Sequence, residues 1–194
     1  MKTEEIQQVV KRLQQMGYYA EPKKVDIAIP EAGKHLADGL RYFLGSNARW
    51  HKDYEHIVSW LSNNHGKGLL VLGNPGTGKS LICERILPIL LYHYRQQLIL
   101  KSFRAEDLNT RTTDVLASYA LYIDDIGTEG IRNNYGEKSL VLPDLVDRAE
   151  KYGKLLVMTT NLKQQELLEK YGGRTIDRLR AITEIVTFTG KSFR

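Results

Sequence analysis

Residues 73–80, Gly-Asn-Pro-Gly-Thr-Gly-Lys-Ser, have the residue types and the spacing of a phosphate-binding loop. In such a loop Gly73 and Gly78 let the backbone turn tightly and direct its N–H groups inward. Lys79 then reaches the β- and γ-phosphates, and the hydroxyl of Ser80 binds Mg²⁺. The motif predicts binding of a nucleoside triphosphate, with ATP and Mg²⁺ as the expected cofactors. The expected phosphate-binding residues are Gly73, Asn74, Pro75, Gly76, Thr77, Gly78, Lys79 and Ser80.

Two adjacent carboxylates, Asp124 and Asp125, follow an apolar segment at residues 120–123. In P-loop enzymes one acid at this strand end holds Mg²⁺ and a neighbouring acid can orient or deprotonate the attacking water. We therefore assign Asp124, together with Ser80, to the metal and Asp125 to the water. On its own, Asp-Asp before Ile-Gly is equally compatible with a turn. Its place behind an apolar strand, downstream of a P-loop, favours the catalytic role.

Two further candidates lie toward the C-terminus. Asn161 follows the apolar segment 155–158, and its amide could bond the γ-phosphate or the attacking water; the alternative is a cap for the next helix. Arg174 and Arg178 are four residues apart and share a helical face. They are either surface groups in salt bridges or arginines that enter a neighbour's ATP site and stabilise the charge of the transferring phosphate.

The elements that position these residues alternate in type. The P-loop lies in a strand–loop–helix context. An apolar segment precedes it, and residues 81–83 can begin a helix after it. Strands are expected near 68–72, 98–103, 119–124, 154–160 and 184–189. Helices are expected near 79–94, 105–110, 137–152, 163–171 and 175–181. Such alternation predicts an α/β fold, with a parallel five-stranded sheet flanked by helices.

Residues 1–45 are expected to form a short helical N-terminal extension, and residues 46–194 the ATP-binding core. A first helix begins at Thr3, ends at Gly17 and has one apolar face, which should pack on its own domain or, alternatively, dock onto another protein. The alternating Val25, Ile27 and Ile29 predict a short strand or an extended linker. Residues 31–44 predict a second helix. A third, capped by Ser46 or Asn47, should carry Trp50, and residues 36–50 are the candidate adenine contacts.

The composition bears on the cellular compartment and the partners of the protein. The chain has 194 residues, a net charge of +5 and one cysteine, Cys83, which excludes an internal disulfide and predicts a reducing compartment. Residues 1–6 lack the apolar core of a signal peptide, and no apolar run reaches membrane-spanning length. We therefore expect a cytoplasmic protein without a membrane partner. The mild positive charge is compatible with a nucleic-acid partner and equally with an ordinary surface.

The motifs GNPGTGKS, LYIDDIGTE, VMTTNL and GGRTIDRL occur in an order and spacing that resemble those of AAA+ ATPases. Within that class, residues 46–194 are similar to DnaC-type helicase loaders and IstB-type transposition helpers, including phage-encoded versions. The resemblance implies a P-loop NTPase fold of the AAA+ type. It also implies that Asn161 is the sensor-1 residue and Arg178 the arginine finger, with Arg174 as the competing candidate.

Three departures from the AAA+ pattern bear on function. We expect no helical lid after the last strand, as in some loader proteins. Asp125 stands where AAA+ proteins commonly have glutamate, and a carboxylate about 1 Å out of place can cost roughly 10²-fold in rate, so the ATPase is expected to be weak or stimulated by a partner. The segment 107–118, where loaders often have extra DNA-contacting helices, is short. Five basic residues could still form a track that binds DNA, or they could simply be a solvated surface. They are Lys101, Arg104, Arg111, Arg132 and Lys138.

The resemblance implies a replicative-helicase loader that works through ATP binding and slow hydrolysis. Its expected partners are the replicative helicase, single-stranded DNA and further copies of itself in a nucleotide-dependent oligomer. One alternative is an ATP-dependent transposition helper that binds double-stranded DNA. A small-molecule P-loop kinase is a third possibility, although the sequence shows neither the arginine-bearing lid nor the substrate insertion that such kinases usually have.

Overall fold

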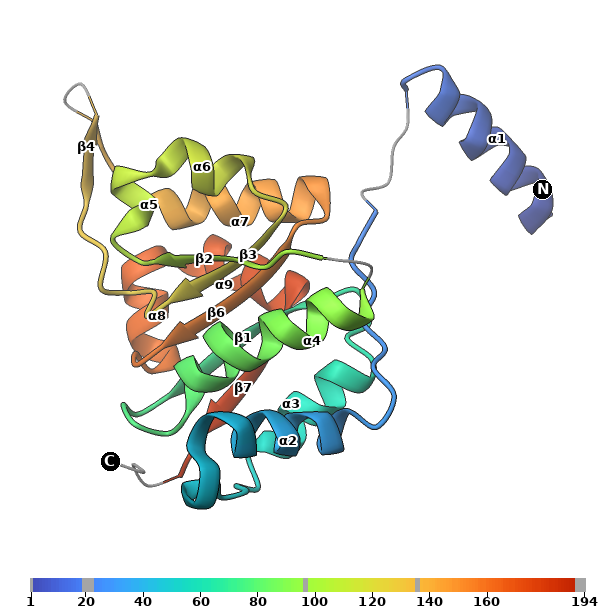
Figure 1. Ribbon diagram of the computed structural model, residues 1–194. Helices are drawn as coiled ribbons and strands as arrows, with labels where there is room; N and C mark the ends of the chain where they lie inside the picture. The colour runs from blue at the N-terminus through green and yellow to red at the C-terminus, as the bar shows by residue number, and fades with distance from the viewer. Residues whose placement is uncertain (1, 19–22, 96–97, 135–136, 191–194) are drawn as a thin grey trace.

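The computed structural model describes residues 2–18, 23–95, 98–134 and 137–190 of the chain. At its centre lies a parallel five-stranded sheet with the strand order β2-β3-β6-β1-β7 (Figure 1). This confirms the α/β fold that the alternating elements predicted. The five strands are β1 (Gly68–Gly73), β2 (Lys101–Arg104), β3 (Ala120–Asp124), β6 (Leu155–Thr160) and β7 (Thr183–Phe188).

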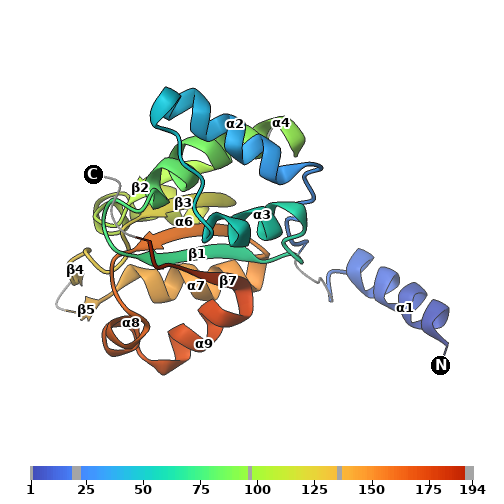
Figure 2. The ribbon, with the colours of Figure 1, turned by 90° about the horizontal axis from the view of Figure 1, so that it is seen from below.

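Helices cover both faces of this sheet (Figure 2). One face packs against α2 (Ala32–Leu44), α3 (Tyr54–Ser62), the π-helical turn η2 (Leu81–Ile86) and its continuation α4 (Leu87–Tyr94). The other packs against α5 (Asp107–Thr110), α6 (Thr112–Ala117), α7 (Val141–Tyr152), α8 (Gln164–Tyr171) and α9 (Gly173–Ile182). Alternate residues of a strand point to opposite faces, so Val71 joins the first apolar cluster and Leu70 the second.

The strand order brings the predicted chemical residues to one edge of the sheet. β1 lies between β6 and β7, and Leu70 is in register with both Met158 and Ile185. β3 pairs with the other side of β6. Because all five strands are parallel, the P-loop after β1, the aspartates at the end of β3 and Asn161 after β6 meet at the same edge.

Residues 23–29 form neither a helix nor a strand and belong to neither sheet of the described structure. Val25, Ile27 and Ile29 are buried in the same apolar cluster as α2 and η2. Asn64 holds this segment, because its Oδ1 accepts from the N–H of Ile27 at 2.7 Å and its Nδ2 donates to the carbonyl of Val25 at 2.9 Å. The alternation that suggested a strand therefore reflects packing. The domain boundary at residue 45 remains a prediction. Helix α2, which precedes this boundary, packs into the same apolar core as the residues after it.

Helix α1 (Thr3–Gln15) is the exception. None of its residues, all of which the structure describes, is buried, and Figure 1 shows the helix apart from the sheet and its covering helices. The side chains of Ile6, Val9 and Leu13 are 36–46% exposed. The expectation that this apolar face packs on its own domain is therefore wrong, and the alternative, docking onto another protein, stays open.

Residues 137–140 do not belong to the helix that was expected over 137–152. β4 (Arg132–Asn134) and β5 (Glu137–Ser139) pair as an antiparallel hairpin, and α7 begins at Val141. The sequence Asn-Asn-Tyr-Gly at 133–136 carries turn-forming residues, which explains a hairpin better than a helical start. Pro143 then lies in the first turn of α7, where it costs no helical hydrogen bond.

Three smaller predictions were also inaccurate. A 3₁₀ turn, η1 (Gly45–Asn47), replaces the predicted helix start, and α3 begins at Tyr54, so Trp50 lies outside it. β2 begins at Lys101 rather than at residue 98. Helix α6 was not expected. No helix of the described residues is long and apolar enough to cross a membrane, and none follows β7 before the description ends at Gly190.

Candidate nucleotide site

The P-loop joins β1 to the π-helical turn η2 and is shaped by its glycines. Gly73 and Gly78 have φ angles of +151° and +90°, which side-chain-bearing residues rarely adopt. A Cβ on Gly78 would lie 2.6 Å from the hydroxyl of Tyr54, so there is also no space for one. Thr77 closes the turn, because its Oγ1 donates to the carbonyl of Asn74 at 2.9 Å. The loop leads directly into η2, which begins at Leu81, and N–H groups at the start of a helix can bind an anion.

Lys79 is buried in the loop it belongs to, with 6% of the residue exposed. Its Nζ donates to the carbonyls of Gly73 at 2.5 Å and Asn74 at 2.9 Å, and to Oδ1 of Asn161 at 2.9 Å. Burial lowers the pKa of Lys79, and the carboxylates of Asp125 and Asp124 oppose that shift. The three donors of the ammonium are thus all used, and phosphate oxygens would compete with these neutral oxygens for a cation.

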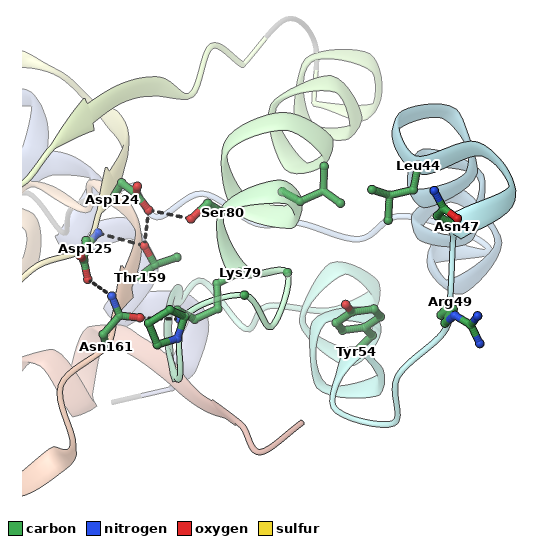
Figure 3. A pocket seen from close by; sticks show the side chains of 14 residues that line it. Leu44, Asn47, Arg49, Tyr54, Lys79, Ser80, Asp124, Asp125, Thr159 and Asn161 are labelled. Carbon is green, nitrogen blue, oxygen red and sulfur yellow. Dashed lines mark hydrogen bonds between the residues drawn. The ribbon is translucent and has the colours of Figure 1, made fainter. Parts of the chain in front are cut away.

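Three hydroxyl groups donate to one oxygen of Asp124, and Figure 3 shows two of them, those of Ser80 and Thr159. Asp124 Oδ1 accepts from Ser80 Oγ at 3.0 Å, Thr159 Oγ1 at 2.7 Å and Tyr122 Oη at 2.5 Å. Burial, helped by the carboxylate of Asp124, raises the pKa of Tyr122, so its hydroxyl stays protonated and donates. Ser80 and Asp124 therefore bring a hydroxyl and a carboxylate oxygen to the same point, which is the donor set that Mg²⁺ takes from a protein beside phosphates.

Asp125 bonds Asn161 rather than the Ser80–Asp124 pair. Its Oδ1 accepts from Nδ2 of Asn161 at 2.8 Å, while its backbone N–H donates to Thr159 Oγ1 at 3.0 Å. Its φ of +58° is unusual for a residue other than glycine and is one that aspartate tolerates. This left-handed turn directs Asp125 away from Asp124, so that the two carboxylates have different partners and can take different roles (Figure 3).

These groups line one cavity of ≈ 750 Å³, a size suited to a nucleotide. The phosphate side is formed by the P-loop with Asp124, Asp125, Thr159 and Asn161. The opposite wall comes from earlier in the chain, and its lining residues are Leu44, Asn47, Arg49 and Tyr54. Three of these four fall in the segment 36–50, the candidate for adenine contacts, which remains a prediction. Tyr54 was missed; an aromatic residue in a helix before a P-loop is the signal that could have found it.

Thr159 and Tyr122 were also missed as site residues. Thr159 donates to Asp124 and accepts from the backbone of Asp125, so one hydroxyl orders both acids. A hydroxyl at the polar end of the strand before Asn161 was the available signal. Cys83 is fully buried, and burial raises the pKa of its thiol. This cysteine therefore packs as an apolar side chain in the core.

The two arginines do not reach the cavity of their own chain, as judged from the described residues that line it. Arg178 forms ion pairs with Asp147 and, at 3.2 Å, with Glu150 of α7. Arg174 lies one turn earlier on α9, 3.6 Å from Asp147. Their side chains are 27% and 78% exposed, respectively. Both arginines therefore lie away from the cavity of their own chain, beside the acids of α7.

Some residues of the proposed basic track have acidic partners in their own chain. Arg104 lies 3.8 Å from Glu106, and Arg111 lies 3.5 Å from Asp114 and stacks over the ring of Phe103. Lys101 is exposed. The side chains of Arg132 and Lys138 lie outside what the structure describes. Partnered arginines favour the solvated-surface alternative for this part of the chain.

Solved structures with the same arrangement include the DnaC helicase loader, with a TM-score of 0.54 and 18% identity over 88% of this chain and 94% of that one. DnaI matches with a TM-score of 0.50 and 20% identity over 66% of this chain and 73% of that one. This chain has the DnaC-type AAA+ fold. AMPPCP-bound DnaA from Aquifex aeolicus matches with a TM-score of 0.52 and 11% identity, over 72% of this chain and 48% of that one. No protein-family model and no curated protein matches the sequence.

The AAA+ fold explains why the site is divided between distant segments. The sheet order places β6 between β1 and β3, so Asn161 comes to lie between the P-loop and the aspartates. Ser80, Asp124, Asp125 and Asn161 are thus brought together as expected from the sequence, although the role of each residue remains a prediction. The arginines of α9 are kept outside this group.

Proposed function

We propose that this protein is an AAA+ ATPase of DNA replication that binds Mg²⁺-ATP in the cavity beside the P-loop. The observation that carries the proposal is the hydrogen-bonded series Lys79–Asn161–Asp125 along the phosphate side of that cavity. It joins the phosphate-binding cation to the candidate base through one amide. A glycine-rich turn with an unrelated lysine would not supply such a series.

Each residue of the site then has one task. Lys79 and the P-loop N–H groups bind the phosphates, and Asn161 orients the γ-phosphate or the attacking water. Ser80 and Asp124 would hold Mg²⁺, which neutralises phosphate charge when bound. Asp125 accepts the proton of the water. Because aspartate is shorter than the usual glutamate, hydrolysis is slow, and ATP serves mainly to switch and assemble the protein.

Assembly follows from the position of α9. Arg174 and Arg178 lie on the outer side of the domain and can stabilise phosphate charge only in a neighbouring copy. A site completed in this way depends on a nucleotide-dependent oligomer. The acids of α7 that pair with Arg178 keep this arginine ordered in the separate molecule, and they must exchange with phosphate oxygens when a neighbour docks.

The proposed partners are a replicative helicase and single-stranded DNA. Support comes from the likeness to the DnaC helicase loader, which extends over most of both chains, and from the unburied apolar face of α1. That face would be covered by the helicase. An amphipathic helix outside its own domain is the usual form of a helix-in-groove ligand.

The test is to measure molar mass by light scattering with ATP, single-stranded DNA and a candidate replicative helicase, alone and in combination. Leu13→Glu, on the apolar face of α1, should abolish the helicase complex. Gln8→Glu, on the polar side of the same helix, should leave it intact. Absence of any complex under every nucleotide condition would overturn the helicase role. Filaments on double-stranded DNA without helicase affinity would favour a transposition helper, and ADP formation that needs an added metabolite would favour a kinase.

A further inference from the structure

Glu129 is a buried carboxylate outside the nucleotide cavity. It belongs to the loop after β3, is 3% exposed, and does not appear among the described residues that line the cavity. A charge in this position is costly unless it is hydrogen-bonded. Glu129 Oε2 accepts from the N–H of Gly127 at 2.7 Å, and Oε1 accepts from the hydroxyl of Tyr171, the last residue of α8. The carboxylate therefore joins its own loop to a helix that follows it by more than thirty residues.

A second contact from α8 supports the same loop. Lys170 Nζ donates to the carbonyls of Gly127 at 2.5 Å and Glu129 at 2.8 Å. Gly127 has a φ of +105°, and a Cβ there would lie 2.3 Å from Cδ1 of Leu162, so the backbone of the loop is in close contact with the segment that leads into α8. Polar contacts and close packing together fix residues 127–129 against α8.

The opposite end of this loop carries Asp125. Asp125 has a left-handed backbone, which persists only where the surroundings determine it. Two bonds from β6 do so at this end: Ile126 N–H donates to the carbonyl of Thr159 at 2.8 Å, and Thr160 Oγ1 donates to the carbonyl of Ile126 at 2.6 Å. The loop is thus fixed to β6 next to Asp125 and to α8 at Glu129, and its catalytic candidate lies at one end of a doubly anchored segment.

Tyr171 also connects the loop to α9. Tyr171 ends α8, Gly172 is the N-cap of α9, and Arg174 is the second residue of that helix. Tyr171 is 6% exposed, and burial together with its bond to Glu129 raises the pKa of its hydroxyl, which therefore remains a donor. A movement of the Asp125 loop cannot occur without either breaking this bond or moving the start of α9.

We propose that Glu129 and Tyr171 are positioning residues, whose hydrogen bond couples the Asp125 loop of the nucleotide site to the arginine-bearing helix α9. The role of α9 toward a neighbouring ATP rests on the proposed function. The bond itself does not, because it lies within one chain. Through this link, the nucleotide state sensed at Asp125 and Asn161 reaches the surface that the next subunit contacts.

The experiment compares Tyr171→Phe with Tyr94→Phe in the full-length protein. Tyr94 is the matched control because its hydroxyl also makes a single side-chain bond, to His35 at 2.7 Å, in the opposite apolar cluster. Amide hydrogen exchange should quicken about five- to tenfold in residues 125–130 and 173–182 of Tyr171→Phe, the factor expected for one lost hydrogen bond. The same peptides should be unchanged in Tyr94→Phe.

Unchanged exchange in both segments of a folded Tyr171→Phe protein would overturn the proposal. So would exchange that rises equally throughout the chain, because the bond would then contribute to stability alone. Glu129→Gln is the second variant, for use if Tyr171→Phe does not fold. It keeps the shape of the side chain but cannot accept hydrogen bonds from both Gly127 and Tyr171 in the same way. Exchange should quicken in the same two segments.

ATP turnover separates this inference from the proposed function. In Tyr171→Phe, kcat should fall several-fold while the affinity for ATP changes less than about twofold, because neither residue touches the cavity. A loss of affinity with unchanged kcat would contradict the positioning role. A wild-type protein that binds no ATP would contradict the proposed function instead, and the exchange comparison would still decide whether the link exists.

Discussion

Lys79 Nζ donates a hydrogen bond of 2.9 Å to Oδ1 of Asn161, although 82 positions separate the two residues in the chain. The same amide donates from Nδ2 to Asp125 Oδ1 at 2.8 Å. An uncharged amide has both an acceptor and a donor, so it can face a cation on one side and a carboxylate on the other. Phosphates that bind Lys79 would compete with Asn161, and a change at Asn161 is transmitted directly to Asp125.

Lys79→Ala should abolish measurable ATP binding. The substitution removes a buried cation from the place that the phosphate charges of ATP would occupy. The expected loss is at least about 2–3 kcal/mol, or roughly 30- to 150-fold in affinity. Isothermal titration with ATP and Mg²⁺ measures it. Lys52→Ala, which removes an exposed lysine, is the control and should bind as the wild type does. Equal affinity of the two variants would remove Lys79 from the phosphate site.

Asp125→Asn should spare ATP binding and stop turnover. Asparagine tolerates the left-handed backbone at this position and still bonds Asn161, but it cannot accept a proton from water. Asp124→Asn should instead weaken the Mg²⁺ dependence of binding, because it removes the carboxylate that lies beside Ser80. Single-turnover hydrolysis and titration at several Mg²⁺ concentrations distinguish the two. If both variants failed in the same step, the separate roles assigned to the acids would be wrong.

The sequence predicted which residues lie together because they follow strand ends. A P-loop, an Asp-Asp pair and an asparagine each come after an apolar run, and a parallel sheet necessarily brings such ends to one edge. Thr159 escaped notice because a threonine in a strand is ordinary, and its double contact depends on the register of β6 with β3. Tyr54 escaped for a similar reason, since it reaches the cavity only through the packing of α3 on the sheet.

The hairpin β4–β5 and the unburied α1 show the limits of local patterns. The segment 137–140 was assigned to a helix because Val141 and the residues after it have helical periodicity, and pattern alone does not locate the first residue of a helix. For α1, the apolar face was evident from the sequence, but what covers an apolar face is a tertiary or quaternary question. Composition and periodicity carry no information on it.

Arg178→Ala should lose ATP turnover only in the assembled protein. The decisive measurement is ATP turnover in a mixture of two variants. Lys79→Ala subunits should bind no ATP but present an intact α9, whereas Arg178→Ala subunits should bind ATP and lack the proposed finger. Each variant alone should be inactive, and their mixture should recover part of the wild-type rate.

Arg174→Ala serves as the competing variant in the same mixing assay. If Arg174→Ala requires the mixture for activity and Arg178→Ala does not, Arg174 is the finger. Arg178 would then act only through its ion pairs with Asp147 and Glu150, which at this partly exposed position contribute about 0–1 kcal/mol to stability. No recovery on mixing, in a proven oligomer, would contradict a role in trans for either residue.

The stability contributed by Tyr171 should disappear at high pH. Burial and the bond to Glu129 raise the pKa of Tyr171 in the folded protein, whereas tyrosine in an unfolded chain has a pKa of about 10. The folded state therefore keeps a proton that the unfolded state loses. The contribution is complete below about pH 10 and falls above it by up to about 1.4 kcal/mol per pH unit.

Urea unfolding of the wild type and of Tyr171→Phe between about pH 8 and pH 11 measures this contribution. The difference in free energy of unfolding should be constant up to about pH 10 and shrink above it, because phenylalanine has no proton to lose. Burial lowers the pKa of Lys79 and of Lys154, which gives the opposite slope, but both lysines are present in both proteins and cancel in the difference. Tyr42→Phe, which removes an exposed hydroxyl, is the control variant. A difference that stayed constant with pH for Tyr171→Phe would mean that burial beside Glu129 does not raise the pKa of this hydroxyl.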